Sequence, residues 1–276
     1  MLTNLRKPEY PCSAPDGMHA SSAANGVTAN ITVQLGSEHI GGILFQPALS
    51  GPWPLIICSH GLTGTHENLI ETCVRLTELG VCALAFDFRN SNGPLSSGGI
   101  SAMSVETEVT DLTQVLSFCQ ALPVVIPDKI VLLGHSQGGL VSALVAGRHP
   151  ASVAGLILMY PAFSVVDDVH RIFASRESLP PSYEFLGATL GRVFAEDIWD
   201  LDVYREIAAY DKPVLIMHGT EDTIVPAAYS ERAARTYAQA TFLPLRGAGH
   251  GFRGDAFEQS MDAVAAYLRQ IHILPQ

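Results

Sequence analysis

The sequence predicts one large α/β domain whose central, mostly parallel sheet is covered by helices on both faces. Three observations favour this class. Short apolar strands alternate with amphipathic helices along most of the chain, which is typical of a parallel sheet. Apolar residues make up 47% of the 276 residues and charged residues only 16%, which suits a large buried core and argues against disorder. The alternation is interrupted over residues 162–209, so we expect a cap inserted into the domain.

The chain before this interruption is predicted to form six strands. Residues 1–26 are rich in Pro, Ser and Ala without periodicity, and predict an irregular lead-in. The helix that begins near Leu69 ends at Gly80, which is typical of a C-cap, and a second amphipathic helix covers residues 105–119. Most of the strands are short and wholly apolar, as in the middle of a parallel sheet. The six strands are Thr28–Leu35, Ile40–Phe45, Leu55–Cys58, Val81–Phe86, Ile130–Leu133 and Gly155–Met159.

After the interruption the strand–helix pattern resumes. The interruption itself predicts mainly short helical pieces with many aromatic residues. The strand Val214–Met217, a helix over residues 227–238, the strand Thr241–Leu245 and a last amphipathic helix follow. The predicted organisation therefore has three parts: the lead-in (1–26), the core (27–161 and 210–276), and the cap (162–209) between the sixth and seventh strands.

The stretch VLLGHSQGGL, residues 131–140, runs an apolar strand into an apolar helix with Ser136 at the tip of the turn. Gly134 and Gly138 lack a Cβ, which allows strand and helix to pack closely around a sharp bend. The G-x-S-x-G spacing between a strand and a helix is typical of a nucleophile elbow. The alternative is a glycine-rich connector whose serine only caps the helix. A dehalogenase is excluded, because it would need an aspartate in place of Ser136.

A base and an acid are expected further along the chain. A serine hydroxyl is too weak an acid to attack an ester unaided, so an imidazole must take its proton and a carboxylate must orient that imidazole. Asp222 follows a strand in MHGTEDTIVP, and His250 follows the next strand in the glycine loop RGAGHGF, in the order expected after the elbow serine. Glu221 is the adjacent alternative acid, but neighbouring loop residues point apart, and we favour Asp222.

The segment SHGLTG, residues 59–64, directly follows an apolar strand at the place where an oxyanion hole takes one backbone donor. The second donor comes from the residue after the nucleophile. We therefore assign the two N–H groups to Leu62 and Gln137. His60 is expected to hold this loop by hydrogen bonding, and it is also a candidate substrate contact.

The motifs HGLTG, FDFRNSNGPLS, GHSQGG, HGTEDTIVP and GAGHGF occur in the order and spacing of the α/β-hydrolase superfamily, from about Thr28 to the C-terminus. The chain more closely resembles bacterial cinnamoyl (feruloyl) esterases, in which an HG-x-T segment pairs with an elbow reading GHSQGG. This resemblance implies an α/β-hydrolase fold with a cap. The loop around residues 90–93 departs from the FDFxGHGxS pattern of those enzymes.

Taken with the resemblance, these residues predict a serine carboxylesterase. Ser136 would attack the ester carbonyl while His250 takes its proton, with Asp222 orienting the imidazole and the Leu62 and Gln137 amides stabilising the oxyanion. The resemblance implies esters of hydroxycinnamic acids as substrates. Neither a metal nor an organic cofactor is needed for this chemistry.

The cap holds an unusual share of the aromatic residues, and a planar acyl group would pack well among them. The resemblance implies a polar group for the phenolic hydroxyl, for which Asp167 or Asp168 is the candidate by position. The alternative for each aromatic residue is that it merely packs the cap onto the core. The candidate contacts in the cap are Phe163, Asp167, Asp168, Tyr183 and Trp199.

Two rival functions stay open. The first keeps the chemistry on another acyl group, as in a short-chain carboxylesterase, a monoacylglycerol lipase or an acyl-peptide hydrolase. The second is a ligand receptor that retains a hydrolase fold with little turnover, against which the intact Ser, Asp and His argue.

The predicted partner is a small-molecule ester, as an esterase implies, and the composition argues against two other kinds of partner. The net charge of −11 speaks against nucleic acid or an anionic membrane, and no apolar run reaches the length of a membrane span. The N-terminal segment lacks the apolar core of a Sec signal, and four of five cysteines lie in apolar segments, so we expect a reducing, cytoplasmic location. The absence of C-x-x-C and H-E-x-x-H motifs indicates no zinc site. The sequence does not decide between a monomer and a homodimer.

Overall fold

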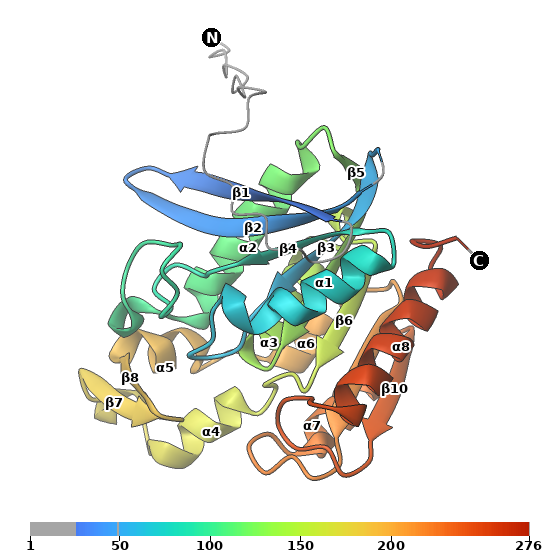
Figure 1. The fold of residues 1–276 in the computed structure, drawn as a ribbon. Coiled ribbons are helices and arrows are strands. Elements are labelled where there is room, and N and C mark those ends of the chain that lie inside the picture. Colours follow the sequence, from blue (N-terminus) through green and yellow to red (C-terminus); the bar gives the residue numbers. More distant parts are fainter. Residues whose placement is uncertain (1–25, 49, 276) are drawn as a thin grey trace.

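The computed structural model describes residues 26–48 and 50–275, and its centre is one eight-stranded sheet (Figure 1). The strand order is β1-β2-β4-β3-β5-β6-β9-β10, and every pair from β4 to β10 is parallel, whereas β1 and β2 are antiparallel to their neighbours. The strands are β1 (Gly26–Leu35), β2 (Glu38–Pro47), β3 (Trp53–Ser59), β4 (Cys82–Phe86), β5 (Val125–His135), β6 (Gly155–Met159), β9 (Val214–Gly219) and β10 (Ala240–Leu245). The predicted lead-in lies outside the described residues, except for Gly26, which begins β1.

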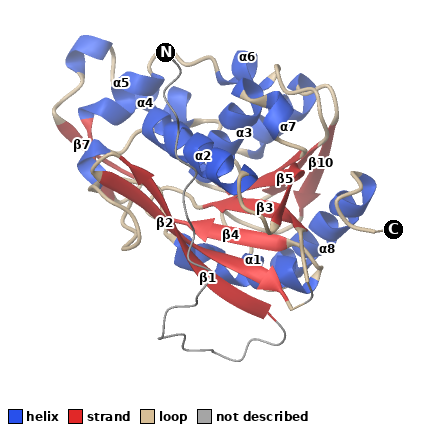
Figure 2. Ribbon diagram, turned by 90° about the horizontal axis from the view of Figure 1, so that it is seen from above, coloured by secondary structure: helices blue, strands red, loops and turns tan. Residues whose placement is uncertain are grey.

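Helices cover both faces of this sheet, as predicted (Figure 2). Successive side chains of a strand point to opposite faces, so Leu55 and Ile57 of β3 join one buried cluster while Ile56 and Cys58 join the other. Helices α2, α3 and α7 contribute to the first cluster, and α1 and α8 to the second. Their bounds are α1 (Ile70–Glu78), α2 (Val105–Gln120), α3 (Gln137–Arg148), α7 (Ala227–Thr236) and α8 (Asp255–Gln270).

The turn between β5 and α3 bends as sharply as the glycine pattern predicts. Ser136 has φ 52° and ψ −117°, outside the regions that a residue with a side chain ordinarily occupies. A Cβ on Gly138 would lie 2.4 Å from the carbonyl oxygens of both Ser59 and His60, and one on Gly134 would lie 2.2 Å from the Gly138 oxygen. The strand ends and the helix can therefore meet only because both positions are glycine.

Residues 162–209, which we propose as the cap, lie between β6 and β9 and include a β-hairpin as well as short helices. The hairpin was not expected from the sequence. Leu186 and Gly187 form its two-residue turn, and both have positive φ (47° and 83°), as a type I′ turn requires. The elements are α4 (Val165–Ile172), β7 (Ser182–Phe185), β8 (Ala188–Gly191), α5 (Arg192–Ile198) and α6 (Val203–Ile207), with a single 3-10 turn at Arg176–Ser178.

The contact at Gly138 predicts a strong effect of a single methyl group. Gly138→Ala should lower the free energy of unfolding by about 1–3 kcal/mol or more, because the clashing atoms belong to the backbone and cannot rotate away. Gly99→Ala is the matched control, since nothing lies within 4 Å of its Cβ position. Thermal unfolding measures both, and equal melting temperatures for the two variants would contradict this account of the elbow.

Candidate active site

The structure brings Ser136, Asp222 and His250 together at the carboxyl ends of the parallel strands. Ser136 follows β5, Asp222 follows β9 and His250 follows β10. The His250 Nε2 atom lies 2.8 Å from Ser136 Oγ, and its Nδ1 atom lies 2.7 Å from Asp222 Oδ2. An imidazole that donates from Nδ1 to the carboxylate leaves Nε2 free to accept the serine hydroxyl. The three side chains thus form one continuous hydrogen-bonded chain.

Asp222, rather than the neighbouring Glu221, is the carboxylate that faces His250. The Asp222 side chain is fully buried, whereas Glu221 is exposed. The backbone N–H groups of Ile224 and Val225 both donate to Asp222 Oδ1 at 2.9 Å. These bonds fix the carboxylate, so that its second oxygen points at the imidazole.

A second histidine, His218 on β9, also contacts this carboxylate, and the sequence analysis missed it. Its Nε2 atom lies 2.9 Å from the Val225 carbonyl oxygen and 3.1 Å from Asp222 Oδ2. Its Nδ1 atom lies 2.7 Å from Ser230 Oγ, on α7. Burial lowers the pKa of His218, so the ring is neutral at pH 7 and its Nε2–H is the donor. The only signal in the sequence is a histidine at the end of a buried strand.

The predicted oxyanion-hole residues flank Ser136 in the same cavity. Gln137 is the first residue of α3, and the N–H at that position has no partner within the helix. Among the described residues, the N–H of Leu62 donates to no protein group; the turn around it is closed by a 2.9 Å bond from the Gly64 N–H to the Gly61 oxygen. Two free backbone donors therefore lie beside the serine.

His60 was expected to hold the loop of residues 59–64 by hydrogen bonding, and its ring makes two such contacts. Its Nδ1 atom is 2.8 Å from the Gly61 oxygen, and its Nε2 atom accepts the Phe88 N–H at 3.3 Å. The ring also packs edge-on against Phe88, and the residue is buried. Both ring nitrogens have partners within the protein, and His60 lines neither of the two cavities that Ser136 lines.

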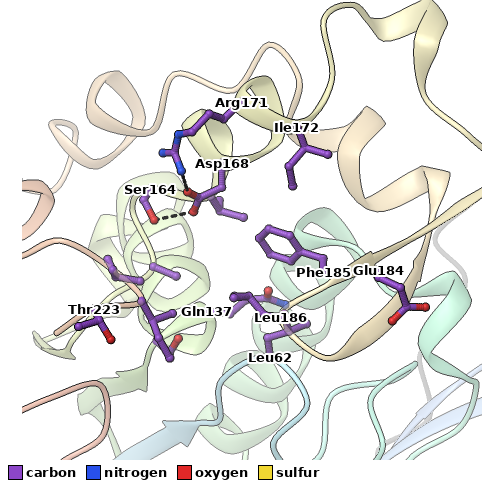
Figure 3. A pocket seen from close by; sticks show the side chains of 15 residues that line it. Leu62, Gln137, Ser164, Asp168, Arg171, Ile172, Glu184, Phe185, Leu186 and Thr223 are labelled. Carbon is purple, nitrogen blue, oxygen red and sulfur yellow. Dashed lines mark hydrogen bonds and ion pairs between the residues drawn. The ribbon is translucent and has the colours of Figure 1, made fainter.

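A cavity of about 480 Å³ opens between Ser136 and residues 162–209 (Figure 3). Most of its wall is apolar. One of its charged residues is Asp168, which accepts a hydrogen bond from Ser164 at 2.7 Å and pairs with Arg171 at 2.9 Å. The lining residues are Leu62, Ser136, Gln137, Ala162, Ser164, Val165, Asp168, Arg171, Ile172, Glu184, Phe185, Leu186, Thr223, Ile224 and Val225.

Of the five candidate contacts in the cap, only Asp168 lines this cavity. Phe163, Asp167 and Trp199 surround a separate hollow of about 290 Å³. Tyr183 lies outside both. The structure therefore does not bring these four to the serine, and Phe185 supplies the aromatic wall instead.

Local packing explains where these side chains go. Successive residues of a helix point about 100° apart, so Asp167 turns away from Asp168 and accepts a 2.7 Å hydrogen bond from Tyr229. The Tyr183 ring packs edge-on against Phe173 with centroids 4.9 Å apart. In the same way, Trp199 packs against His170 and Phe163 against Tyr204. Each of these rings therefore contacts another ring within residues 162–209.

A second cavity, of about 720 Å³, meets the first at Ser136 and extends between α1 and α8. It shares Leu62 and Ser136 with the first cavity, but His250 lines only the second. Many of its remaining side chains are polar, and they include Thr63, Glu67, Asn68, Glu71, Thr72 and Arg253.

Behind Gln137 lies Glu108, a buried carboxyl on α2 that the sequence analysis did not single out. The Gln137 side-chain amide donates to Glu108 Oε2 at 2.8 Å. Burial raises the pKa of Glu108 to about 8; the hydrogen bond from Gln137 opposes this shift, and the neighbouring Asp111 adds to it. Glu108 is therefore largely protonated at pH 7.

Within residues 26–48 and 50–275, no group of three or more His, Cys, Asp or Glu side chains is placed to hold a metal ion. Within them also, no helix has both the length and the apolar character that a membrane crossing requires.

Comparison with known proteins places residues 56–267 in a match to the Alpha/beta hydrolase family. An uncharacterised protein of Mycobacterium tuberculosis is 25% identical over 269 residues, which cover 97% of this chain and 88% of the relative. A Methylorubrum extorquens protein, provisionally assigned as a carboxymethylenebutenolidase, is 24% identical over 246 residues, covering 84% of this chain and 75% of the relative. The solved structure of Est1E from Butyrivibrio proteoclasticus with ferulic acid bound has a TM-score of 0.81 at 24% identity, over 88% of this chain and 99% of Est1E. The predicted fold class is confirmed.

The raised pKa of Glu108 predicts how stability depends on pH. Between about pH 4.5 and about pH 8 the unfolded chain loses this proton while the folded chain keeps it, so the free energy of unfolding falls as pH rises. Glu108→Gln removes this contribution, and its stability relative to the wild type should increase over that interval. Urea unfolding at several pH values measures this, with Glu71→Gln, an exposed carboxylate on α1, as control. A pH-independent difference between Glu108→Gln and the wild type would contradict the assignment.

Proposed function

Because this chain belongs to the Alpha/beta hydrolase family, we propose that it is a serine carboxylesterase that hydrolyses esters of hydroxycinnamic acids through an acyl-enzyme. The observation that carries the proposal is the hydrogen-bonded chain from Ser136 through His250 to Asp222. An imidazole 2.8 Å from the serine hydroxyl is placed to take its proton, and a buried carboxylate on the other nitrogen fixes the required tautomer.

In the first half-reaction, Ser136 Oγ forms a bond to the ester carbonyl carbon and its proton passes to His250 Nε2. The carbonyl oxygen gains negative charge and accepts hydrogen bonds from the N–H groups of Leu62 and Gln137. His250 then gives the proton to the leaving alcohol oxygen as the C–O bond breaks, which leaves the acyl group on Ser136. Water, deprotonated by the same imidazole, attacks this acyl group, releases the acid and restores the serine.

The two cavities divide the substrate between its acyl and alcohol parts. His250 must reach the leaving oxygen to protonate it, and His250 lines only the 720 Å³ cavity. The alcohol therefore belongs in that cavity, among its polar side chains. The acyl group then occupies the 480 Å³ cavity, which residues 162–209 cover.

The acyl cavity suits a planar aromatic group with a hydroxyl at its far end. Ile172, Leu186 and Ile224 are 50%, 59% and 46% exposed around its opening, so an apolar acyl group has apolar surface to cover there. Phe185 offers a ring face or edge to an aromatic acyl group. Asp168 keeps acceptor capacity beyond its bonds to Ser164 and Arg171, which a phenolic hydroxyl can use. The ferulic acid bound to Est1E, which has the same fold, supports this reading.

Steady-state hydrolysis of methyl ferulate, methyl p-coumarate and p-nitrophenyl butyrate tests the proposal. We expect kcat/KM for the two cinnamoyl esters to equal or exceed that for the activated butyrate, and Ser136→Ala to lose nearly all turnover. Cleavage of the butyrate alone would retain the serine chemistry but favour a short-chain esterase, a monoacylglycerol lipase or an acyl-peptide hydrolase. Turnover by Ser136→Ala would overturn the mechanism, and a burst without turnover would favour a receptor.

The role of the acid is tested by two adjacent carboxylates. Asp222→Asn should lower kcat about 10,000-fold, because an amide in place of the carboxylate stabilises the wrong tautomer of His250. Glu221→Gln, which alters an exposed neighbour, should stay within a few-fold of the wild type. Both are measured as kcat for the best ester substrate. A greater loss in Glu221→Gln would show that the wrong carboxylate has been assigned.

The phenolic contact is tested by comparing methyl p-coumarate with methyl cinnamate, which lacks the hydroxyl. Asp168→Asn should lower kcat/KM for the coumarate by about tenfold relative to the cinnamate, since a hydrogen bond to a charged acceptor is weakened. Asp167→Asn is the matched control, because that side chain faces Tyr229 instead of the cavity. If Asp168→Asn lowers kcat/KM equally for both esters, Asp168 does not bind the phenolic hydroxyl.

A further inference from the structure

We propose that Glu108 is a positioning residue for the oxyanion hole. Glu108 holds the Gln137 side chain and thereby orients the Gln137 backbone N–H toward the ester oxygen. The inference rests on the proposed function, because it assigns a task within the same reaction. It concerns a residue of α2 that touches neither the substrate cavities nor the three catalytic side chains.

The burial of Glu108 calls for an explanation. The residue is only 2% exposed, and within the described chain no Lys, Arg or His forms an ion pair with it. A buried carboxyl without a cation opposes folding, whether it is desolvated as an ion or forced to hold a proton. Its side-chain hydrogen-bond partner is the amide of Gln137. A stabilising role in packing does not account for this residue, since an apolar side chain of the same size would fill the space without the desolvation.

Gln137 is a residue whose orientation has to be held. It directly follows Ser136, whose backbone has a positive φ of 52°, and it is the first residue of α3. Its side-chain nitrogen is fixed at two points, by Glu108 Oε2 at 2.8 Å and by Met103 Sδ at 3.3 Å. Oxyanion stabilisation depends on donors held within about 10–20° of the productive direction. Anchoring the side chain of the donor residue restricts rotation of the peptide unit that carries the N–H.

Asp111, one turn further along α2, is a second buried carboxylate, and its partners differ from those of Glu108. It is also fully buried, but Arg89 pairs with it at 2.7 Å through Nε and donates a second bond from its backbone N–H. This pair links α2 to the loop after β4 and makes no contact with Gln137. Asp111→Asn is therefore a control for loss of a buried carboxylate that accepts its hydrogen bonds from Arg89 and not from Gln137.

Three variants separate positioning from stability. Glu108→Gln keeps an oxygen acceptor and should retain kcat within about threefold, whereas Glu108→Leu removes it and should lower kcat by ~10-fold with KM nearly unchanged, a fraction of the loss for deleting a donor outright. Asp111→Asn should lower the melting temperature without a comparable loss of kcat. Glu108→Met, with the same expectation, replaces the leucine variant if that variant does not fold.

A transition-state analogue gives a readout that a purely structural role would not change. The affinity for a trifluoromethyl ketone, whose adduct with the serine carries an oxyanion, should fall in Glu108→Leu by the same factor as kcat/KM. Wild-type kcat and analogue affinity in Glu108→Leu would overturn this inference while leaving the esterase intact. Equal loss of activity in Glu108→Gln and Glu108→Leu, in step with their melting temperatures, would also overturn it. A wild-type protein that cleaves no ester would instead overturn the proposed function.

Discussion

The close approach of backbone segments at the carboxyl ends of β3, β5 and β6 is the constraint on which the site depends. Helix α3 comes so near to β3 that no atom beyond hydrogen fits at Gly138. The Ser136 N–H donates to the Met159 oxygen at 3.0 Å, and the Ser136 oxygen accepts the Ala162 N–H at 2.9 Å. Two hydrogen bonds to the end of β6 and to the segment after it therefore hold the strained serine backbone. Ser136 lies in the cavity that Leu62 and Gln137 also line.

Three buried carboxyl groups near this turn differ in their hydrogen-bond and ion-pair partners. Asp222 accepts hydrogen bonds from two backbone N–H groups and also contacts the rings of His250 and His218, so both of its carboxylate oxygens have partners. Asp111 is paired with Arg89. Glu108 has only an amide as its partner and holds its proton, with its pKa raised to about 8. Of these three, Glu108 therefore has the fewest partners to offset the cost of its burial, and it is the one that contacts Gln137, next to Ser136.

Much of this could be predicted from the sequence, because the relevant signals are local. Gly134 and Gly138 mark a turn that permits no Cβ, and Asp222 and His250 each follow an apolar strand whose end must lie at one edge of a parallel sheet. Their order along the chain, with the serine first and the histidine last, is the one expected when the serine lies on a nucleophile elbow of this fold. The strand bounds differ by only a few residues, and β5 begins at Val125 instead of Ile130.

The remaining features depend on contacts between distant segments, which a single sequence does not reveal. His218 meets Ser230 across β9 and α7, and Glu108 meets Gln137 across α2 and α3. Asp167 and Asp168 are equivalent in the sequence, and only the docking of α4 decides which one faces the cavity. The β7–β8 hairpin turns at Leu186, which carries no signal for the positive φ that it adopts.

The central claim is that Ser136 is a nucleophile activated by its neighbours, and covalent labelling tests it most directly. A fluorophosphonate forms a bond from phosphorus to an activated serine oxygen and loses fluoride, which intact mass spectrometry and peptide mapping detect. The account predicts one adduct per chain, located on Ser136, formed far more slowly when His250 is replaced by alanine. An unlabelled protein, or an adduct on any other residue, would contradict it.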